Sequence, residues 1–335
     1  MKKLISFVLV TSLVFISTAC GTTTATTTTE DSLIPVRLNE VVHSAFYAPQ
    51  YVATELGFFA EEGLDVTVEI GNGADVSMTA LISDAADIAL LGTEAGIYVY
   101  NEGMENYPKA FLQLTQRAGN FLVGREENPD FDWSDLIGSE IIGGRAGGMP
   151  QLVLEYVLAQ NGLEVGVDLE MINNIDFAST AGAFTGEVGD YTAEFDPTAT
   201  TLENNGIGYI VASLGEASGF LPYTVYMATD EMISKQPEVL EAFTAAIYKG
   251  QLWVAEHTAA EIAEVIAPQF PENDLETLTT VIARYKDQDT WKTNPIFDED
   301  GFTLIQDIME AGGELSKRVP FADMVTNEFA ETVME

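Results

Sequence analysis

The sequence predicts an α/β fold divided into two lobes, and three observations support this prediction. From Ile34 onward, short apolar segments alternate with segments whose apolar residues recur at helical spacing. This alternation restarts near residue 135, as expected for a second βα unit. The chain has 335 residues, of which 47% are hydrophobic, so it can bury more than one core. The same composition excludes disorder as a description of the whole chain.

The first series of elements begins with a strand at Ile34 and a helix that Pro49 opens and Gly57 can end. Residues 64–70 alternate apolar and polar side chains, which predicts a strand covered on one face. A glycine turn leads into a second helix, and residues 88–91 form a short buried strand. Because strands and helices alternate here, we expect parallel strands joined by right-handed crossovers.

The second series repeats this order. Residues 140–143 predict a strand, residues 143–148 a glycine-rich loop, and residues 150–161 an amphipathic helix that Gly162 ends. Further strands are expected at 169–172, 191–195, 209–212 and 223–228, with a helix near Ala181 and C-terminal helices at 237–256, 260–267, 274–286 and 302–312. Two such series predict two separate sheets, each in a lobe of about 100 residues or more.

The N-terminus has the features of an export signal. Two lysines precede an apolar run over residues 4–16, and small residues lead to Cys20, the only cysteine of the chain. The run is too short for an ordinary membrane span, so we expect residues 1–19 to be a signal peptide. Cys20 stands where a bacterial lipoprotein signal places its acylated residue, and residues 20–32 form a threonine-rich tether. A plain secreted chain or an uncleaved start is the alternative.

The charge balance excludes several classes of partner. The chain has 14 basic and 53 acidic residues, which gives a formal charge of −39. Removing residues 1–19 would take away two lysines and no acid, so the processed chain would carry 12 − 53 = −41. Nucleic-acid binding and polybasic membrane binding both depend on lysine and arginine, and neither is expected here.

Metal and catalytic motifs are not expected. Residues 298–301 resemble part of a calcium loop, but a third spaced oxygen and the closing glutamate are missing. His43 and His257 are the only histidines, and neither has a partner at metal-ligand spacing. The sequence contains no Ser-His-Asp order and no nucleophile elbow. We therefore expect no metal, no cofactor and no catalysis.

Ligand-contact candidates follow the predicted strands. The N–H groups of the loop at 143–148 can converge on an anion at a helix N-terminus, and Arg145 could clamp a carboxylate, sulfonate or phosphate. Alternatively, Arg145 pairs with the acidic surface. Phe46 and Tyr47 could stack on a ligand or pack in the core. Thr93 and Glu94 follow a buried strand, where they could meet a ligand or cap the next helix.

Several segments carry a family resemblance. They resemble the substrate-binding proteins of ABC importers in the nitrate/taurine/alkanesulfonate class, which includes binders of thiamine-pyrimidine precursors. The match runs from about residue 36 to 315. The segments that carry it are His43-Ser-Ala-Phe-Tyr-Ala-Pro-Gln-Tyr-Val-Ala53, Leu56-Gly-Phe-Phe-Ala-Glu-Glu-Gly-Leu-Asp-Val66, Ala86-Asp-Ile-Ala-Leu-Leu-Gly-Thr93, Asp135-Leu-Ile-Gly-Ser-Glu-Ile-Ile-Gly-Gly144 and Phe195-Asp-Pro197.

The resemblance implies a periplasmic-binding-protein type II, or Venus-flytrap, fold. Lobe 1 would comprise residues 33–124 and 225–335, and lobe 2 residues 125–224. A monomer anchored by lipid on the extracytoplasmic membrane face would close on its ligand and deliver it to a permease and its ATPase. The resemblance places ligand contacts at His43, Ser44, Phe46, Tyr47, Thr93, Glu94, Gly144, Arg145, Gly147, Gly148, Phe195 and Asp196.

The candidate residues are compatible with two classes of ligand. Arg145 and the glycine loop favour a small anion such as a sulfonate or nitrate. Glu94 and Asp196 favour an amine or an aminopyrimidine that donates N–H groups, with an aromatic side chain stacked on its ring. Two other functions remain as alternatives. One is a pyrimidine-synthesis-type enzyme of the same fold, whose cysteine-rich motif this chain lacks, and the other is a surface adhesin or structural lipoprotein.

Overall fold

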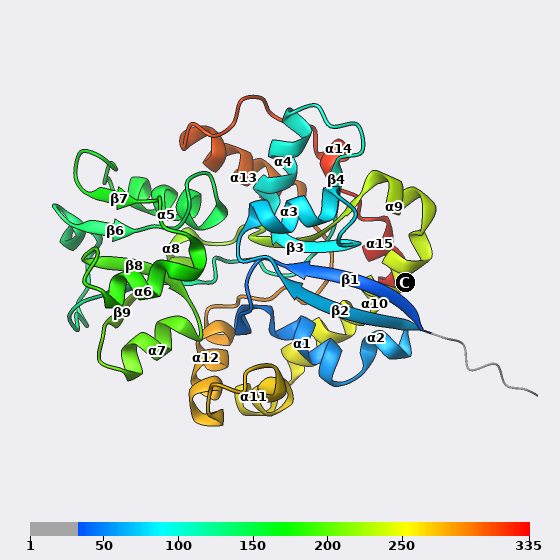
Figure 1. Ribbon diagram of the computed structural model, residues 1–335, viewed down its shortest axis with the longest axis horizontal. Helices are drawn as coiled ribbons and strands as arrows, with labels where there is room; N and C mark the ends of the chain where they lie inside the picture. The colour runs from blue at the N-terminus through cyan, green and yellow to red at the C-terminus, as the bar shows by residue number, and fades with distance from the viewer. Residues whose placement is uncertain (1–32) are drawn as a thin grey trace, which may run out of the picture. The chain divides into compact units, whose positions relative to one another are not determined.

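The strands form two five-stranded sheets. The computed structural model describes residues 33–335, so the predicted signal peptide, Cys20 and the tether lie outside the described residues. Figure 1 shows the first sheet, in blue and cyan with β10 and β4, beside the second sheet in green. The two sheets with their surrounding helices confirm the predicted α/β class.

The first sheet has the order β2-β1-β3-β10-β4. Its strands are β1 (Ile34–Glu40), β2 (Leu64–Ile70), β3 (Ile88–Gly92), β4 (Pro108–Gln113) and β10 (Thr224–Thr229). β1 pairs in parallel with β2 and β3, which confirms the expected parallel pairing. β10 runs antiparallel to both β3 and β4, because the chain enters it from the second sheet. The first sheet is therefore mixed.

The helices of the first series are α1 (Ala48–Glu55), α2 (Phe58–Glu61), α3 (Ala74–Ile82) and α4 (Thr93–Asn101), and the short η1 (Ala45–Tyr47) precedes them. α1 and α3 lie close to the predicted positions, whereas α2 was not predicted. The long helix α10 (Pro237–Glu256) has the predicted bounds and packs against α1 and α15 (Glu328–Met334). A Cβ at Gly250 would overlap the backbone carbonyl of Pro49, so this close helix contact requires glycine.

The second sheet has the order β7-β6-β8-β5-β9. Its strands are β5 (Asn120–Gly124), β6 (Glu140–Ile142), β7 (Glu170–Ile172), β8 (Tyr191–Phe195) and β9 (Tyr209–Ser213). β6 pairs in parallel with β7 and β8, whereas β5 runs antiparallel between β8 and β9. The expected lobe boundary at 124/125 placed β5 with the first sheet. Its hydrogen bonds place it in the second, so the chain changes sheets before residue 120.

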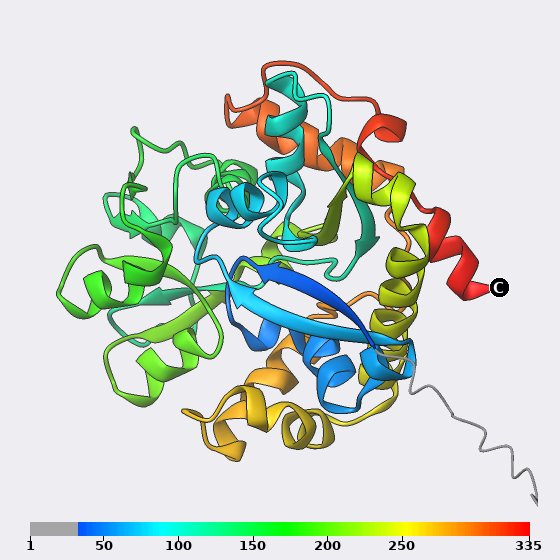
Figure 2. The ribbon, with the colours of Figure 1, turned by 45° about the vertical axis from the view of Figure 1, so that its right-hand side comes forward.

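The helices that accompany the second sheet are α5 (Met149–Gln160), α6 (Thr180–Thr185), α7 (Thr198–Asn204) and α8 (Leu214–Ser218), with η2 (Trp133–Leu136) and η3 (Phe177–Ser179). The remaining elements are α9 (Asp230–Lys235), α11 (Ala259–Ile266), η4 (Ala267–Gln269), α12 (Leu275–Asp287), α13 (Glu299–Ala311) and α14 (Phe321–Met324). Two C-terminal helices reach the second sheet's helices: α13 packs on α5, and α12 lies beside α7 (Figures 1 and 2). Within residues 33–335, no helix is long and apolar enough to cross a membrane.

Candidate ligand-binding site

A cavity of about 60 Å³ lies between elements of the two sheets. From the first sheet's side it is lined by Val41, Val42, Tyr47, Gly73, Ala74, Gly92, Glu94, Tyr223 and Thr224, and from the second by Arg145, Gly148, Met149, Pro150, Phe177 and Phe195. Most of these residues lie at or after the carboxyl ends of β1, β2, β3, β6, β7 and β8, whereas Tyr223 and Thr224 lie at the amino end of the antiparallel β10. Open α/β sheets bind their ligands at these strand ends.

Aromatic side chains form much of the cavity wall. Tyr47, Phe177, Phe195 and Tyr223 line it directly. Phe46 is fully buried behind them, with its ring centroid 5.5 Å from that of Phe195 and 5.7 Å from that of Tyr223. Phe46 and Tyr47 were expected either to stack on a ligand or to pack in the core. Phe46 packs in the core, whereas Tyr47 lines the cavity.

Glu94 is a buried carboxyl group at the cavity. It lies in the first turn of α4, and its Oε1 accepts the backbone N–H of Met149 from the start of α5 at 3.1 Å. A Cβ at Gly92 would overlap the carboxyl group, so this glycine makes room for Glu94. Burial raises the pKa of Glu94 to about 7, despite its backbone hydrogen bonds.

Two residues that line the cavity each have a buried polar atom with no hydrogen-bond partner among the described residues. These atoms are Oε2 of Glu94 and the phenol oxygen of Tyr223. Burial and the nearby Glu94 raise the pKa of Tyr223 well above its ordinary value. Buried polar atoms without a partner are rare in folded proteins, and here both belong to residues that line one cavity.

The position of Thr93 differs from the expected one. The Thr93 hydroxyl is fully buried and donates to the carbonyl of Pro222 at 3.1 Å, and Thr93 does not line the cavity. Thr224 on β10 lines it instead. Thr224 and Tyr223 were not predicted as site residues, because β10 reaches this place only through its antiparallel pairing with β3.

The glycine loop contacts the first sheet's helices. Arg145 donates through Nη1 to Oδ1 of Asp75 on α3, so the two residues form an ion pair between the loop and that helix. The Tyr98 hydroxyl of α4 donates to the carbonyl of Gly147 at 2.8 Å. Gly144 and Gly147 have φ values of +97° and +75°, which favour glycine, but neither lines the cavity. Gly148, which precedes α5, does line it.

A larger groove of about 520 Å³ adjoins the cavity. It shares Ala74, Glu94, Arg145 and Gly148 with the cavity, so the Arg145–Asp75 pair lies where the two spaces meet. Three acidic residues, Asp75, Glu94 and Glu314, and one basic residue, Arg145, are the charged residues among the described residues that line the cavity and the groove. The approach to the cavity is therefore acidic.

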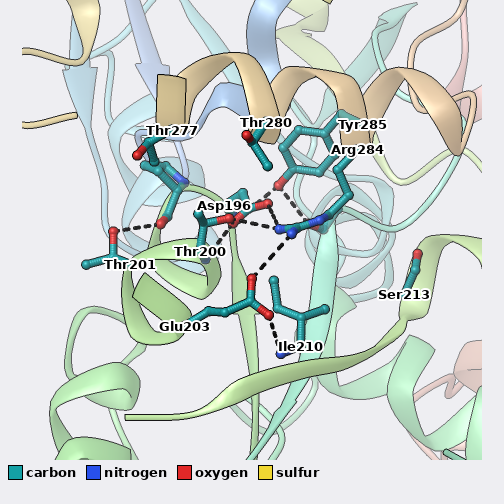
Figure 3. A network of polar contacts seen from close by, with 12 residues as sticks. Asp196, Thr200, Thr201, Glu203, Ile210, Ser213, Thr277, Thr280, Arg284 and Tyr285 are labelled. Carbon is teal, nitrogen blue, oxygen red and sulfur yellow. Dashed lines mark hydrogen bonds and ion pairs between the residues drawn. The ribbon is translucent and has the colours of Figure 1, made fainter. Parts of the chain in front are cut away.

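Asp196 does not line the cavity. Figure 3 shows its buried carboxylate between α7 and α12: Oδ1 accepts the N–H of Thr200 at 2.8 Å and its hydroxyl at 2.7 Å, and Oδ2 accepts Nη1 of Arg284 at 2.9 Å. Arg284 also approaches Glu203 at 3.5 Å. Instead of lining the ligand site as expected, Asp196 forms an ion pair with Arg284 that joins the end of β8 to α12. Ser44, another expected contact, donates its hydroxyl to the Asp196 carbonyl.

His43 also faces away from the cavity. Its Nδ1 lies 2.8 Å from Oε1 of the buried Glu40, and its Nε2 lies 2.8 Å from the carbonyl oxygen of Gln269 in η4. A carboxylate and a carbonyl both accept hydrogen bonds, which favours the imidazolium form of the ring, and the Tyr51 hydroxyl also lies 3.1 Å from Nδ1. His43 therefore joins β1 to η4. Between residues 33 and 335 no three acidic, histidine or cysteine side chains are grouped as a metal site would require.

The chain is similar to a family of known proteins. The family model described as "NMT1/THI5 like" matches residues 45–260. The protein named "Putative binding protein YtlA" of Bacillus subtilis (strain 168) is 45% identical over 304 residues, which cover 91% of each chain.

Solved structures show the same fold at low sequence identity. The alkanesulfonate-binding protein SsuA from Xanthomonas axonopodis pv. citri, bound to MOPS, has a TM-score of 0.71 at 16% identity, covering 87% of this chain and 98% of SsuA. The nitrate-binding protein NrtA from Synechocystis has a TM-score of 0.68 at 16% identity, covering 90% and 88%. All three relatives are binding proteins by name. The resemblance inferred from the sequence is thus confirmed, and the chain belongs to the NMT1/THI5-like family.

Proposed function

We propose that this chain is the extracytoplasmic substrate-binding component of an ABC importer. It would capture a small organic nutrient between two lobes and deliver it to the permease. The observation that carries this proposal is the cavity at the carboxyl ends of strands from both sheets, lined by aromatic side chains and a few polar groups. Membership of the NMT1/THI5-like family supports it.

The lobes we propose follow the two sheets, so the second lobe begins with β5 rather than at residue 125 and ends before β10. Three contacts near the cavity join elements of the two sheets: Arg145 with Asp75, Tyr98 with the Gly147 carbonyl, and Glu94 with the Met149 N–H. A cavity of about 60 Å³ is well below the roughly 300–1,000 Å³ of typical ligand pockets. Binding of an organic ligand would therefore require these contacts to open and the cavity to widen.

Two ligand classes fit this function, an organic anion such as a sulfonate and a nitrogen heterocycle such as a vitamin precursor. The names of SsuA and NrtA refer to alkanesulfonate and nitrate. The residues of the cavity bind rather than react in this proposal, and no cofactor takes part. An enzyme of the same fold and an adhesin are the competing functions.

Ligand screening by thermal unfolding tests the proposal. The purified chain is heated with sulfonates, nitrate, aminopyrimidines, riboflavin and polyamines. A ligand at a hundred times its Kd should add about 2.7 kcal/mol to the free energy of unfolding. The absence of any shift would count against an importer, and chemical turnover of a screened compound would favour an enzyme.

Membrane anchoring is a separate part of the proposal. Cleavage before Cys20 and acylation of its thiol would hold the protein as a monomer on the outer face of the cell membrane. In cell fractionation, the parent chain should sediment with membranes, and Cys20→Ser should not be acylated. If metabolic labelling with a palmitate analogue marks both chains equally, Cys20 is not the anchor.

A further inference from the structure

Two residues of the cavity wall have buried, unpartnered atoms that can accept N–H groups. Oε2 of Glu94 and the Tyr223 oxygen are buried and lack a partner among the described residues, whereas Oε1 of Glu94 already accepts the Met149 N–H. In its ionised form the Glu94 carboxylate only accepts hydrogen bonds, and a phenol oxygen can accept one as well as donate. A ligand that donates N–H groups would therefore satisfy both residues at once.

The one cation at the cavity is already neutralised. Arg145 is paired with Asp75, and the cavity and groove together are lined by three carboxyl groups, Asp75, Glu94 and Glu314. An anionic ligand would have to displace Asp75 and approach Glu94. A cationic ligand meets neither obstacle, and the acidic groove would attract it.

The aromatic wall suits the same class. Tyr47, Phe177, Phe195 and Tyr223 present ring surfaces to the cavity. Aromatic faces carry negative electrostatic potential, so they stabilise a cation placed over them and stack on a planar group. With pKa near 7, Glu94 can ionise when such a cation binds.

We infer that the ligand is a planar nitrogen compound, cationic or neutral, that donates N–H groups to Glu94 and Tyr223, and that it is not a sulfonate- or nitrate-like anion. This inference rests on the proposed function and names the class of its ligand. It assigns Glu94 and Tyr223 as the residues that decide specificity and assigns Arg145 to closure of the groove rather than to the ligand.

Isothermal titration with a matched pair of probes tests the inference. Benzamidine and benzenesulfonate share a six-membered aromatic ring but carry an N–H-donating cation and an anion, respectively. We expect benzamidine to bind at least about tenfold more tightly, since a charge-assisted hydrogen bond accounts for such a factor. Glu94→Gln should weaken benzamidine binding by about tenfold or more, and Tyr223→Phe by about threefold.

Glu194→Gln is the matched control. Glu194 is also a buried carboxyl, but its oxygens accept the hydroxyls of Thr180 and Thr192 and it does not line the cavity. Its replacement should leave the affinity for benzamidine unchanged. Tyr223→Phe removes a hydroxyl that has no partner in the described residues, so it remains informative if Glu94→Gln does not fold.

The outcomes separate the inference from the proposed function. Tighter binding of benzenesulfonate or nitrate, lost in Arg145→Gln, would overturn the inference and leave the importer proposal standing. If neither aromatic probe binds, mass spectrometry of metabolites retained by the protein from a cell extract decides. A retained N–H donor lost in Glu94→Gln supports the inference, and a retained anion overturns it. Retention of nothing counts against both proposals.

Discussion

The buried carboxylate of Asp196 should contribute strongly to stability rather than to ligand recognition. The perturbation is Asp196→Asn, which keeps the size of the side chain and removes its charge. The carboxylate accepts two hydrogen bonds from Thr200 and one from Nη1 of Arg284 at 2.9 Å. An asparagine has one acceptor oxygen, so it can face either Thr200 or Arg284, and not both.

The geometry sets the size of the effect. If the amide oxygen faces Thr200, the charge-assisted bond with Arg284 is lost, which costs about 1.5–3 kcal/mol. If it faces Arg284, the buried Thr200 N–H loses its acceptor at a cost of about 1–3 kcal/mol. The Arg284 side chain is 26% exposed and lies 3.5 Å from Glu203, so water and that carboxylate limit the loss. We expect about 2–3 kcal/mol in total, a large share of the stability of an ordinary domain.

Equilibrium unfolding in urea at pH 7 measures this loss, with tryptophan fluorescence and circular dichroism followed together to check that one transition occurs. Asp307→Asn is the matched control. Asp307 is half exposed and pairs with Arg318 at the surface, so its replacement should leave the midpoint unchanged. The reasoning fails if Asp196→Asn changes the free energy of unfolding by less than about 0.5 kcal/mol, the range of ordinary surface substitutions.

Two further predictions concern His43 and Gly119. Burial lowers the pKa of His43, but its hydrogen bonds with Glu40 and the Gln269 carbonyl raise it more, so the net shift is upward. Its contribution to stability should be complete below the unfolded pKa of about 6.5 and be lost as pH rises through the folded value. Urea unfolding should therefore show a steeper decline above pH 6.5 for the parent than for His43→Gln, and equal slopes would contradict the imidazolium assignment. Gly119→Ala would place a methyl group in the Phe46 ring and cost at least about 1–3 kcal/mol. Thermal unfolding of the two variants measures this cost, and the control Gly182→Ala, with open space around it, should lose no stability.

Elements with a clear local period could be predicted from the sequence. The alternation in residues 64–70 became β2, and the helix expected at 237–256 became α10 with the same bounds. β4 and β5 were not predicted, because their short apolar runs, Pro108–Gln113 and Asn120–Gly124, lack an alternation that separates a strand from a buried loop. The antiparallel entry of β10 depends on the path of the chain between sheets, and no local pattern contains that information.

The candidate site shows a sharper limit of the same kind. Arg145, Glu94 and Asp196 were recognisable as charged residues next to strand ends, so all three could be expected near a ligand. What separates them is the partner of each group. Asp196 meets Arg284, which is 88 residues further along the chain, and Arg145 meets Asp75, which is 70 residues away.

Pairing over such distances reverses the expectation based on charge alone. In a chain with 53 acids, a rare arginine looks like the informative group, and a glutamate looks like ordinary surface. In the folded chain the abundant acids make it easy for an arginine to find a partner, and Arg145 has one in Asp75. Because acidic residues far outnumber basic ones, a buried carboxyl group can be left without a basic partner. Glu94, with Oε2 unpaired in the described structure, is that group. Selectivity at this cavity should therefore depend on whether the ligand supplies a hydrogen-bond donor to Glu94.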